Sequence, residues 1–213
     1  MLLYELTDLV DDYNRTHFIV ANNITTMSQH STVPLYSHKR NVNEVGMHIP
    51  GTTEVLENDE RVAFWRPDGW PCQWSYVEFE IDGIQFTCTE QAMMYLKAML
   101  FNDHPVAHSI LSADHPKKYK SLGRKVKNFD ESKWESNKFD IVERVNYAKF
   151  DQNPLFKQAL LNTGNRLLIE ASPLDSIWGI GVDPKTALSL LESQFKGQNL
   201  LGKALMKVRE SLK

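Results

Sequence analysis

Glu90 and Lys97 are the two side chains of this sequence whose types and spacing best suit a chemical role. On an α-helix, a spacing of seven residues places both side chains on one face, two turns apart. A carboxylate can stabilise a positive charge when ionised and protonate a leaving group when neutral. A lysine with a lowered pKa can add to an aldehyde and form a Schiff base. The spacing fits equally well a helix-start acid and a solvated lysine, so both interpretations stay open.

Three further side chains have the chemistry of a binding site for a phosphorylated ribose. Arg124 follows Gly123, and its guanidinium can bind a phosphate through two hydrogen bonds. Asn146 carries donors and an acceptor for ribose hydroxyls or a base edge. Asp175 lies on a predicted loop, where it could bind ribose or assist Glu90. Each also has an ordinary structural alternative: a helix C-terminal Gly-Arg, a surface amide and a turn cap.

Tryptophan side chains offer flat faces on which a base can stack. Taken singly, each is more typical of a core than of a ligand site. The candidates are Trp74, Trp134 and Trp178.

Helices are the main elements expected to position these residues. Alternating patterns predict strands at 61–65, 77–81 and 84–88, with Asp82-Gly83 as a hairpin turn between the last two. Thr89 is predicted to cap a helix over 90–101, and strand character returns only at 167–170. Further helices are predicted at 103–112, 114–121, 131–149, 154–162, 184–195 and 199–212. The pattern predicts an α+β fold, a helix-rich single domain with a small β-sheet.

The first 60 residues differ in texture from the rest. An amphipathic pattern predicts a helix near the N-terminus, at about 2–13, and residues 22–60 are polar and irregular. We therefore divide the chain into an N-terminal extension, 1–60, and a domain, 61–213.

Composition excludes several classes of protein. The chain has 213 residues, 42% of them hydrophobic, and a net charge of −3, which argues against a sequence-independent DNA binder. Its two cysteines make no disulfide scaffold, and no signal peptide or membrane-length apolar run is evident. We expect a cytoplasmic protein with no membrane association. The sequence leaves the oligomeric state open.

No metal or cofactor motif stands out. His104 and His108 have the i, i+4 spacing of zinc ligands, but the glutamate of a His-Glu-x-x-His motif is missing. Neither a Walker loop nor a Gly-x-Gly-x-x-Gly motif occurs. We therefore expect no metal and no cofactor.

Four blocks of residues, in order over the C-terminal three-quarters of the chain, carry a resemblance to a known family. They are Gln73-Trp74 with Cys88–Met94 and Lys97-Ala98; Lys120–Arg124 with Phe129-Asp130 and Trp134; Asn146–Phe150 with Asn153-Pro154 and Thr163-Gly164; and Glu170–Pro173 with Asp175, Trp178-Gly179 and Gly197–Gly202. Together they resemble the NADAR/YbiA-like family, whose name refers to NAD and ADP-ribose chemistry.

The resemblance implies a YbiA-like fold and an enzyme that cleaves a base–ribose N-glycosidic bond. It assigns catalytic roles to Glu90, Lys97 and Asp175, with Lys149 as the lysine that competes with Lys97. It also implies a set of substrate-binding residues. These are Gln73, Trp74, Gln91, Arg124, Trp134, Asn146, Lys149, Trp178 and Gly179.

Three functions fit this resemblance. The first is a hydrolase that removes ADP-ribose from ADP-ribosylated guanine in single-stranded DNA or RNA. The second is an N-glycosidase that acts on ribosylaminopyrimidine intermediates of riboflavin synthesis. The third is a module that binds ADP-ribose without catalysis, which the presence of Glu90 and Lys97 at matching positions disfavours. In each case the ligand contains ADP-ribose or a ribose phosphate.

Overall fold

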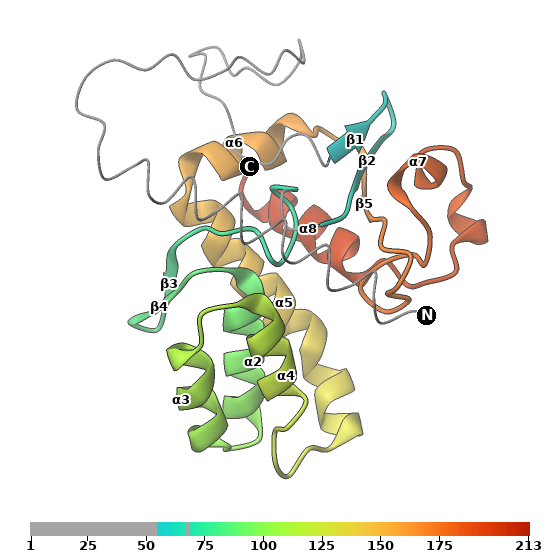
Figure 1. The fold of residues 1–213 in the computed structure, drawn as a ribbon. Helices are drawn as coiled ribbons and strands as arrows, with labels where there is room; N and C mark the ends of the chain where they lie inside the picture. Colours follow the sequence, from blue (N-terminus) through green and yellow to red (C-terminus); the bar gives the residue numbers. More distant parts are fainter. Residues whose placement is uncertain (1–54, 67–68) are drawn as a thin grey trace. The chain divides into compact units, whose positions relative to one another are not determined.

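The computed structural model describes residues 55–66 and 69–213, which form helices and two small sheets (Figure 1). The helix predicted at 2–13 and residues 22–54 lie outside the described residues. The α-helices are α2 (Thr89–Leu100), α3 (His104–Ser112), α4 (Pro116–Gly123), α5 (Glu131–Gln152), α6 (Pro154–Asn162), α7 (Pro184–Ala187) and α8 (Leu200–Ser211). The predicted helix-rich α+β fold is therefore confirmed. None of the helices in this described part is long and apolar enough to cross a membrane.

A three-stranded sheet joins distant parts of the chain. Strand β2 (Arg61–Phe64) pairs antiparallel with β1 (Val55–Glu57) and parallel with β5 (Leu167–Glu170). β5 was predicted, whereas β1 was not. Two of the three β1 side chains are exposed, so this edge strand lacks the alternation of apolar and polar residues that reveals a strand.

The second sheet is the predicted hairpin of β3 (Phe79–Ile81) and β4 (Ile84–Phe86). Asp82 and Gly83 form its turn, with φ angles of 53° and 78°. Two successive positive φ angles are typical of the tight turn that an Asp-Gly pair favours. This part of the prediction is confirmed.

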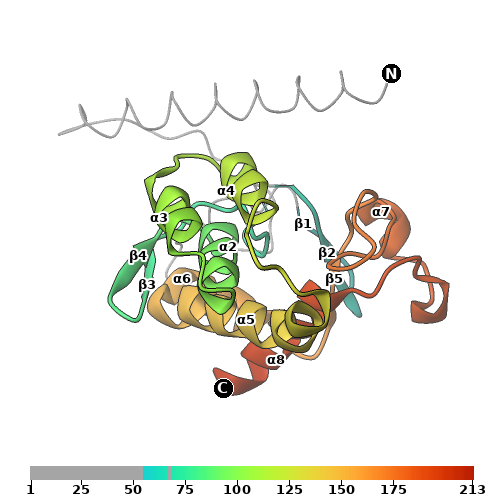
Figure 2. The same ribbon diagram turned by 90° about the horizontal axis from the view of Figure 1, so that it is seen from below.

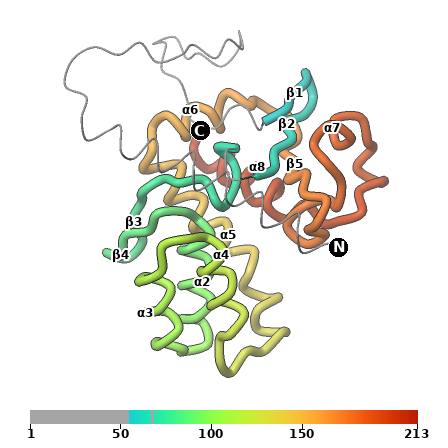
Figure 3. The backbone as a smooth tube through the Cα atoms, in the orientation of Figure 1, coloured from blue at the N-terminus to red at the C-terminus, as the bar shows by residue number. Residues whose placement is uncertain are grey.

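Helix α2 lies at the centre of the helical part. It packs against α3 and α4 on one side and against α5 on the other, as Figure 2 shows. α8 packs against both α5 and β5, and thus connects the helices to the three-stranded sheet. In the tube view, α7 and the segment that follows it lie apart from α2, α3 and α4 (Figure 3).

Two predictions of local structure are wrong. Cys88, rather than Thr89, is the N-cap residue of α2, and the Thr89 hydroxyl donates to the Gln73 carbonyl oxygen at 3.1 Å. The helix predicted at 184–195 is reduced to α7 and a 3₁₀ turn at Glu192–Gln194.

Side chains from a distant part of the sequence donate hydrogen bonds to the segment that ends α7 and precedes the 3₁₀ turn. The Arg61 guanidinium donates to the carbonyl oxygens of Ala187 and Leu190, and the Asn58 side chain donates to that of Leu188. A continuing helix would use those carbonyls for its own hydrogen bonds. The long-range contacts therefore end the helix that local periodicity predicts.

Gly202 allows α8 to lie directly on β5. A Cβ atom there would be 2.1 Å from the Leu168 carbonyl oxygen and 2.5 Å from the Asn199 Oδ1 atom. We expect Gly202→Ala to lower the free energy of unfolding by about 2–4 kcal/mol, because backbone atoms cannot yield as a flexible side chain can. Gly83→Ala is the control, because its Cβ would meet nothing within 4 Å and it costs only left-handed backbone strain, about 1–2 kcal/mol. Urea denaturation measures both, and equal losses would contradict the packing role.

Candidate active site

The N-terminus of α2 is fixed to the turn that precedes β3. The backbone N–H of Glu90 donates to the Gln73 carbonyl oxygen at 2.9 Å, and the Thr89 hydroxyl donates to the same oxygen. The first N–H groups of a helix lack partners within the helix, so this carbonyl satisfies one of them. The contact fixes Glu90 in a buried position, with 5% of its surface exposed.

The Glu90 carboxyl group is buried without full compensation. Its Oε1 atom has no hydrogen-bond partner among the described residues. Burial raises the pKa of Glu90 to about 7, although Lys120, a hydrogen bond from the Trp74 side chain and Arg124 oppose the rise, and Asp175 adds to it. At neutral pH the group therefore exists in both protonation states, which suits an acid or a base in catalysis.

Helix α4 brings positive charge to this carboxyl group. Lys120 lies on α4 and Arg124 directly follows it, and both side chains are exposed. Gly123 allows the approach, because a Cβ atom there would be 2.0 Å from the Met94 Sδ atom of α2. The glycine that the sequence places before Arg124 thus permits close contact between two helices.

Lys97 is on the same helix as Glu90, and its side chain lies against two aromatic rings from outside this helix. Its Nζ atom is 4.5 Å from the centre of the Phe129 ring and 5.0 Å from that of a Trp134 ring. Burial lowers the pKa of Lys97, Glu131 opposes this and Arg124 adds to it. The structure thus brings Lys97, Trp134 and Arg124 together, as a shared site requires.

Glu170, at the end of β5, is the acidic residue that the sequence interpretation missed. Its Oε2 atom is buried and has no hydrogen-bond partner among the described residues. Burial raises the pKa of Glu170 to about 8, Asp175 and Glu90 add to the rise, and Lys120 opposes it. Its presence in the same sequence block as Asp175 was the available signal. Lys120 likewise belongs to one of the four sequence blocks, but its residue type alone assigns it no role.

The loop after β5 holds Asp175 through its own backbone. The Asp175 Oδ1 atom accepts hydrogen bonds from the N–H groups of Ile177 and Trp178, both at 2.8 Å. This is the turn-capping alternative of the sequence analysis. A Cβ atom on Gly179 would lie 2.9 Å from the carbonyl oxygens of both Asp175 and Glu170, so this glycine packs tightly beside the acidic group.

Four predicted binding residues are buried and bonded to the protein itself: Gln73, Gln91, Asn146 and Lys149. The Gln91 side chain accepts from the Thr87 N–H at 2.9 Å and donates to the Ile110 carbonyl oxygen at 3.3 Å. The Gln91 contacts position α2 rather than leaving the amide free for a ligand.

Lys149 is fully buried under the turn that contains Trp70 and Cys72. Its Nζ atom donates to the carbonyl oxygens of these two residues, at 2.8 Å and 3.1 Å. Burial lowers its pKa to about 8. The amine therefore supports the turn leading to Gln73.

Asn146 connects α5 to the same turn. Its Nδ2 atom donates to the Gln73 Oε1 atom at 3.2 Å and to the Val142 carbonyl oxygen at 2.8 Å. Its Oδ1 atom is buried with no partner among the described residues. A buried acceptor of this kind can take a hydrogen bond from a ligand.

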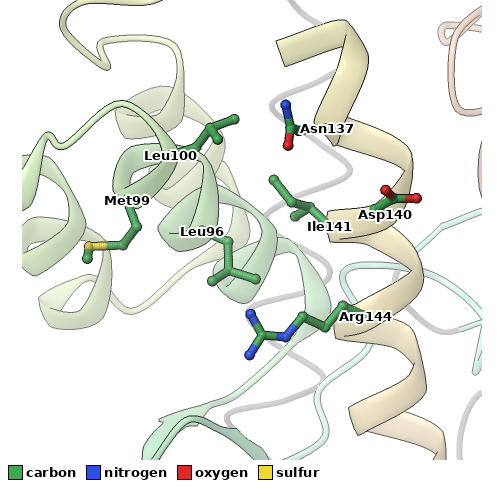
Figure 4. Close-up of a pocket in the computed structure, with 7 residues that line it drawn as sticks. All are labelled: Leu96, Met99, Leu100, Asn137, Asp140, Ile141 and Arg144. Atoms are coloured by element: carbon green, nitrogen blue, oxygen red, sulfur yellow. The ribbon is translucent and has the colours of Figure 1, made fainter. Parts of the chain in front are cut away.

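A groove between α2 and α5 lies elsewhere on the molecule (Figure 4). It has a volume of about 310 Å3 and is lined by Leu96, Met99, Leu100, Asn137, Asp140, Ile141 and Arg144. Neither Glu90 nor Lys97 lines this groove. Arg144 is also paired with Asp82 at 2.6 Å. We therefore place the candidate site at Glu90.

Within residues 55–66 and 69–213, no group of three or more histidine, cysteine, aspartate or glutamate side chains could hold a metal ion.

One family model covers Glu90 and Glu170, the cations beside them and the neighbouring aromatic residues. The model described as the NADAR domain matches residues 63–213. The chain belongs to the NADAR domain family. All residues of the four sequence blocks lie within this NADAR match.

Known proteins extend the comparison. The NADAR chain is 39% identical over 176 residues to N-glycosidase R617 of Acanthamoeba polyphaga mimivirus, covering 83% of this chain and 94% of the relative. It is 33% identical over 118 residues to the maize riboflavin biosynthesis protein PYRR, covering 52% of this chain and 17% of that protein. The NMR structure of Escherichia coli YbiA matches with a TM-score of 0.60 at 25% identity, covering 75% of this chain and 88% of that one. These relatives support an N-glycosidase.

Proposed function

We propose that this NADAR chain is an N-glycosidase that removes ADP-ribose from ADP-ribosylated guanine in nucleic acid. The observation that carries the proposal is the buried Glu90 carboxyl group, which has an oxygen without a partner among the described residues and two nearby cations, Lys120 and Arg124. A carboxylate in this setting can stabilise a cationic sugar, while the cations suit the phosphates that accompany the ribose.

Aromatic residues around Glu90 suit the leaving base. The Trp74 side chain donates to the Glu90 carboxyl group and can hold it in position. Trp134 lies beside Lys97, and Phe129 is exposed next to them. A flat base can stack on such rings.

A basic segment beside the site favours a polyanionic substrate. Residues 117–127 contain six lysines and arginines and no acidic residue, in a chain whose net charge is −3. Among them, Lys118, Lys120, Arg124, Lys125 and Lys127 are exposed. Local positive charge of this kind suits a few phosphate contacts, as a single modified base in a strand requires.

A second candidate is hydrolysis of ribosylaminopyrimidine intermediates of riboflavin synthesis. The name of the maize relative, a riboflavin biosynthesis protein, favours it. The same centre could act on either compound, because both contain a base–ribose N-glycosidic bond next to a phosphate. The resemblance assigns a catalytic role to Asp175. We propose that Asp175 acts electrostatically on Glu90.

Direct incubation separates these candidates. The protein is mixed with an ADP-ribosylated guanine oligonucleotide and, separately, with the riboflavin intermediates, and the loss of each is followed by chromatography. We expect the oligonucleotide to be restored to unmodified guanine with release of ADP-ribose. Consumption of the pyrimidine intermediates alone would favour the second candidate. Binding of ADP-ribose with no turnover of either compound would indicate a non-catalytic module.

Arg124 is expected to bind phosphate rather than take part in the chemistry. Its loss should remove equal stabilisation from the ground state and the transition state, so Arg124→Ala should raise KM about 10- to 100-fold and leave kcat nearly unchanged. Steady-state kinetics on the oligonucleotide measure both constants. Lys125→Ala, which removes the neighbouring exposed cation, is the control and should change KM much less. A fall in kcat at constant KM would place Arg124 at the reaction centre.

A further inference from the structure

Glu170 is held in place by its backbone on two sides. Its N–H donates to the Asn199 Oδ1 atom at 3.0 Å, and its carbonyl oxygen accepts from the Ile180 N–H at 3.0 Å. Gly179 leaves room for the side chain, because a Cβ atom there would lie 3.1 Å from the Glu170 Cγ atom. The carboxyl group therefore leaves the end of β5 in a fixed direction.

Glu170 lies within electrostatic range of a second acidic side chain, Glu90 of α2. Glu170 Oε2 and Glu90 Oε1 are both buried, and neither has a hydrogen-bond partner among the described residues. The charge of Glu90 raises the pKa of Glu170. For both carboxyl groups, Asp175 raises the pKa and Lys120 lowers it. Unpaired buried carboxyl oxygens are costly to the fold, so a pair of them within electrostatic range of each other indicates a ligand.

We infer that Glu170 is a second catalytic residue, the general acid that protonates the departing base, while Glu90 acts as the anionic partner. This inference rests on the proposed function. Paired carboxyl groups with divided roles are a general solution to glycosidic bond cleavage.

The proton balance of the step is complete. The C1–N bond breaks, its electron pair stays with the base, and the base receives a proton from Glu170. Water then adds to C1 of the sugar, directly or by hydrolysis of a Schiff base with Lys97, and gives a proton to Glu90. Unmodified guanine in the strand and free ADP-ribose result, and solvent returns Glu170 to its neutral form and Glu90 to its anion.

The surroundings of the two groups favour this division. Glu170 faces Asp175 from its own loop and Glu90 from α2, both of which disfavour its ionisation, and Lys120 from α4, which favours it. Burial disfavours the ionised form of Glu90 and Asp175 adds to this, whereas Lys120, the Trp74 side chain and Arg124 favour it. Burial raises the pKa of both groups, and Arg124 opposes the rise at Glu90 in addition to Lys120, so the neutral form is favoured more at Glu170.

Two oligonucleotides test the assignment. One carries ADP-ribosylated guanine. The other carries ADP-ribosylated guanine that is also methylated at N7, which makes the base cationic before cleavage, so it can depart without receiving a proton. We expect Glu170→Gln to lower kcat on the first by about 10²–10⁴ and to stay within about tenfold of the wild type on the second. Glu90→Gln should be slow on both, because its role does not depend on the leaving group.

The pH profile gives an independent readout. On the unmethylated oligonucleotide, the wild-type kcat should fall at alkaline pH as Glu170 loses its proton, and the residual activity of Glu170→Gln should lack this alkaline limb. Glu170→Asp, which keeps an acid with a shorter reach, should retain the limb at reduced rate and serves if the Gln variant folds poorly. Equal loss on both substrates would overturn the inference, because a structural role does not distinguish leaving groups. If the wild type cleaves neither oligonucleotide, the proposed function fails instead.

Discussion

Glu90→Gln should lower turnover by about 10²–10⁴ and at the same time stabilise the fold at pH 8. The rate falls because an amide can neither hold the negative charge nor accept a proton. The fold gains because the variant no longer buries an ionised group whose Oε1 atom lacks a partner. Turnover assays and urea denaturation of the same preparation measure both effects.

The pH dependence of the gain follows from the sign of the shift. The pKa of Glu90 rises from 4.5 to about 7 in the folded protein, so the folded state binds the proton more tightly. The contribution of Glu90 to the wild-type free energy of unfolding should therefore decrease between about pH 4.5 and pH 7. Above pH 7 this contribution should be constant. The variant lacks this decrease, so its advantage at pH 8 should be up to about 3 kcal/mol and should vanish near pH 4.

Glu192→Gln is the control, since Glu192 is exposed and remote in sequence from the site. It should change neither turnover nor stability by more than a small amount. Near-normal activity of Glu90→Gln would remove this residue from the mechanism. Lost activity with unchanged stability would show that Lys120 already compensates the ionised carboxylate.

The sequence predicted the parts of the site that depend on local periodicity. Glu90 and Lys97 share one helix, so their common face follows from spacing alone. The Asp82-Gly83 turn is equally local. In each case the neighbours that decide the structure lie within a few residues in the sequence.

Contacts between distant segments account for what was missed. The acceptor for the Thr89 hydroxyl is the Gln73 carbonyl oxygen, which no local pattern reveals. Glu170 is acidic and ends a strand, but its proximity to Glu90 depends on how β5 packs. The carbonyl partners of Arg61 that end α7 are more than 100 residues away. Such contacts become visible only in the folded chain.

Residue type alone does not distinguish a lysine that contacts substrate from a lysine that stabilises the fold. Lys97 and Lys149 are both lysines with lowered pKa, and both lie within the resemblance. In the structure, Lys149 donates to two carbonyl oxygens under a turn, whereas Lys97 rests on the exposed Phe129 ring and the half-buried Trp134 ring. Their surroundings, rather than their chemistry, make Lys97 the better candidate for contact with substrate.

Borohydride added during turnover should fix a covalent adduct on Lys97. If the ribose ring opens, its C1 aldehyde can react with an amine that is partly neutral, and burial lowers the pKa of Lys97 in that direction. Reduction of the Schiff base then leaves a stable sugar-containing mass on the peptide. Peptide mass spectrometry locates it. Lys97→Ala should lose both the adduct and most of the activity.

Lys97→Arg is the matched control for this experiment. A guanidinium keeps the positive charge over the Phe129 and Trp134 rings but forms no Schiff base, so the adduct should disappear and activity should fall with it. An adduct on Lys149 would transfer the role there, although that amine would first have to leave two carbonyl oxygens. An active Lys97→Arg enzyme with no adduct in the wild type would instead mean that the lysine acts by charge alone and that water attacks the sugar directly beside Glu90.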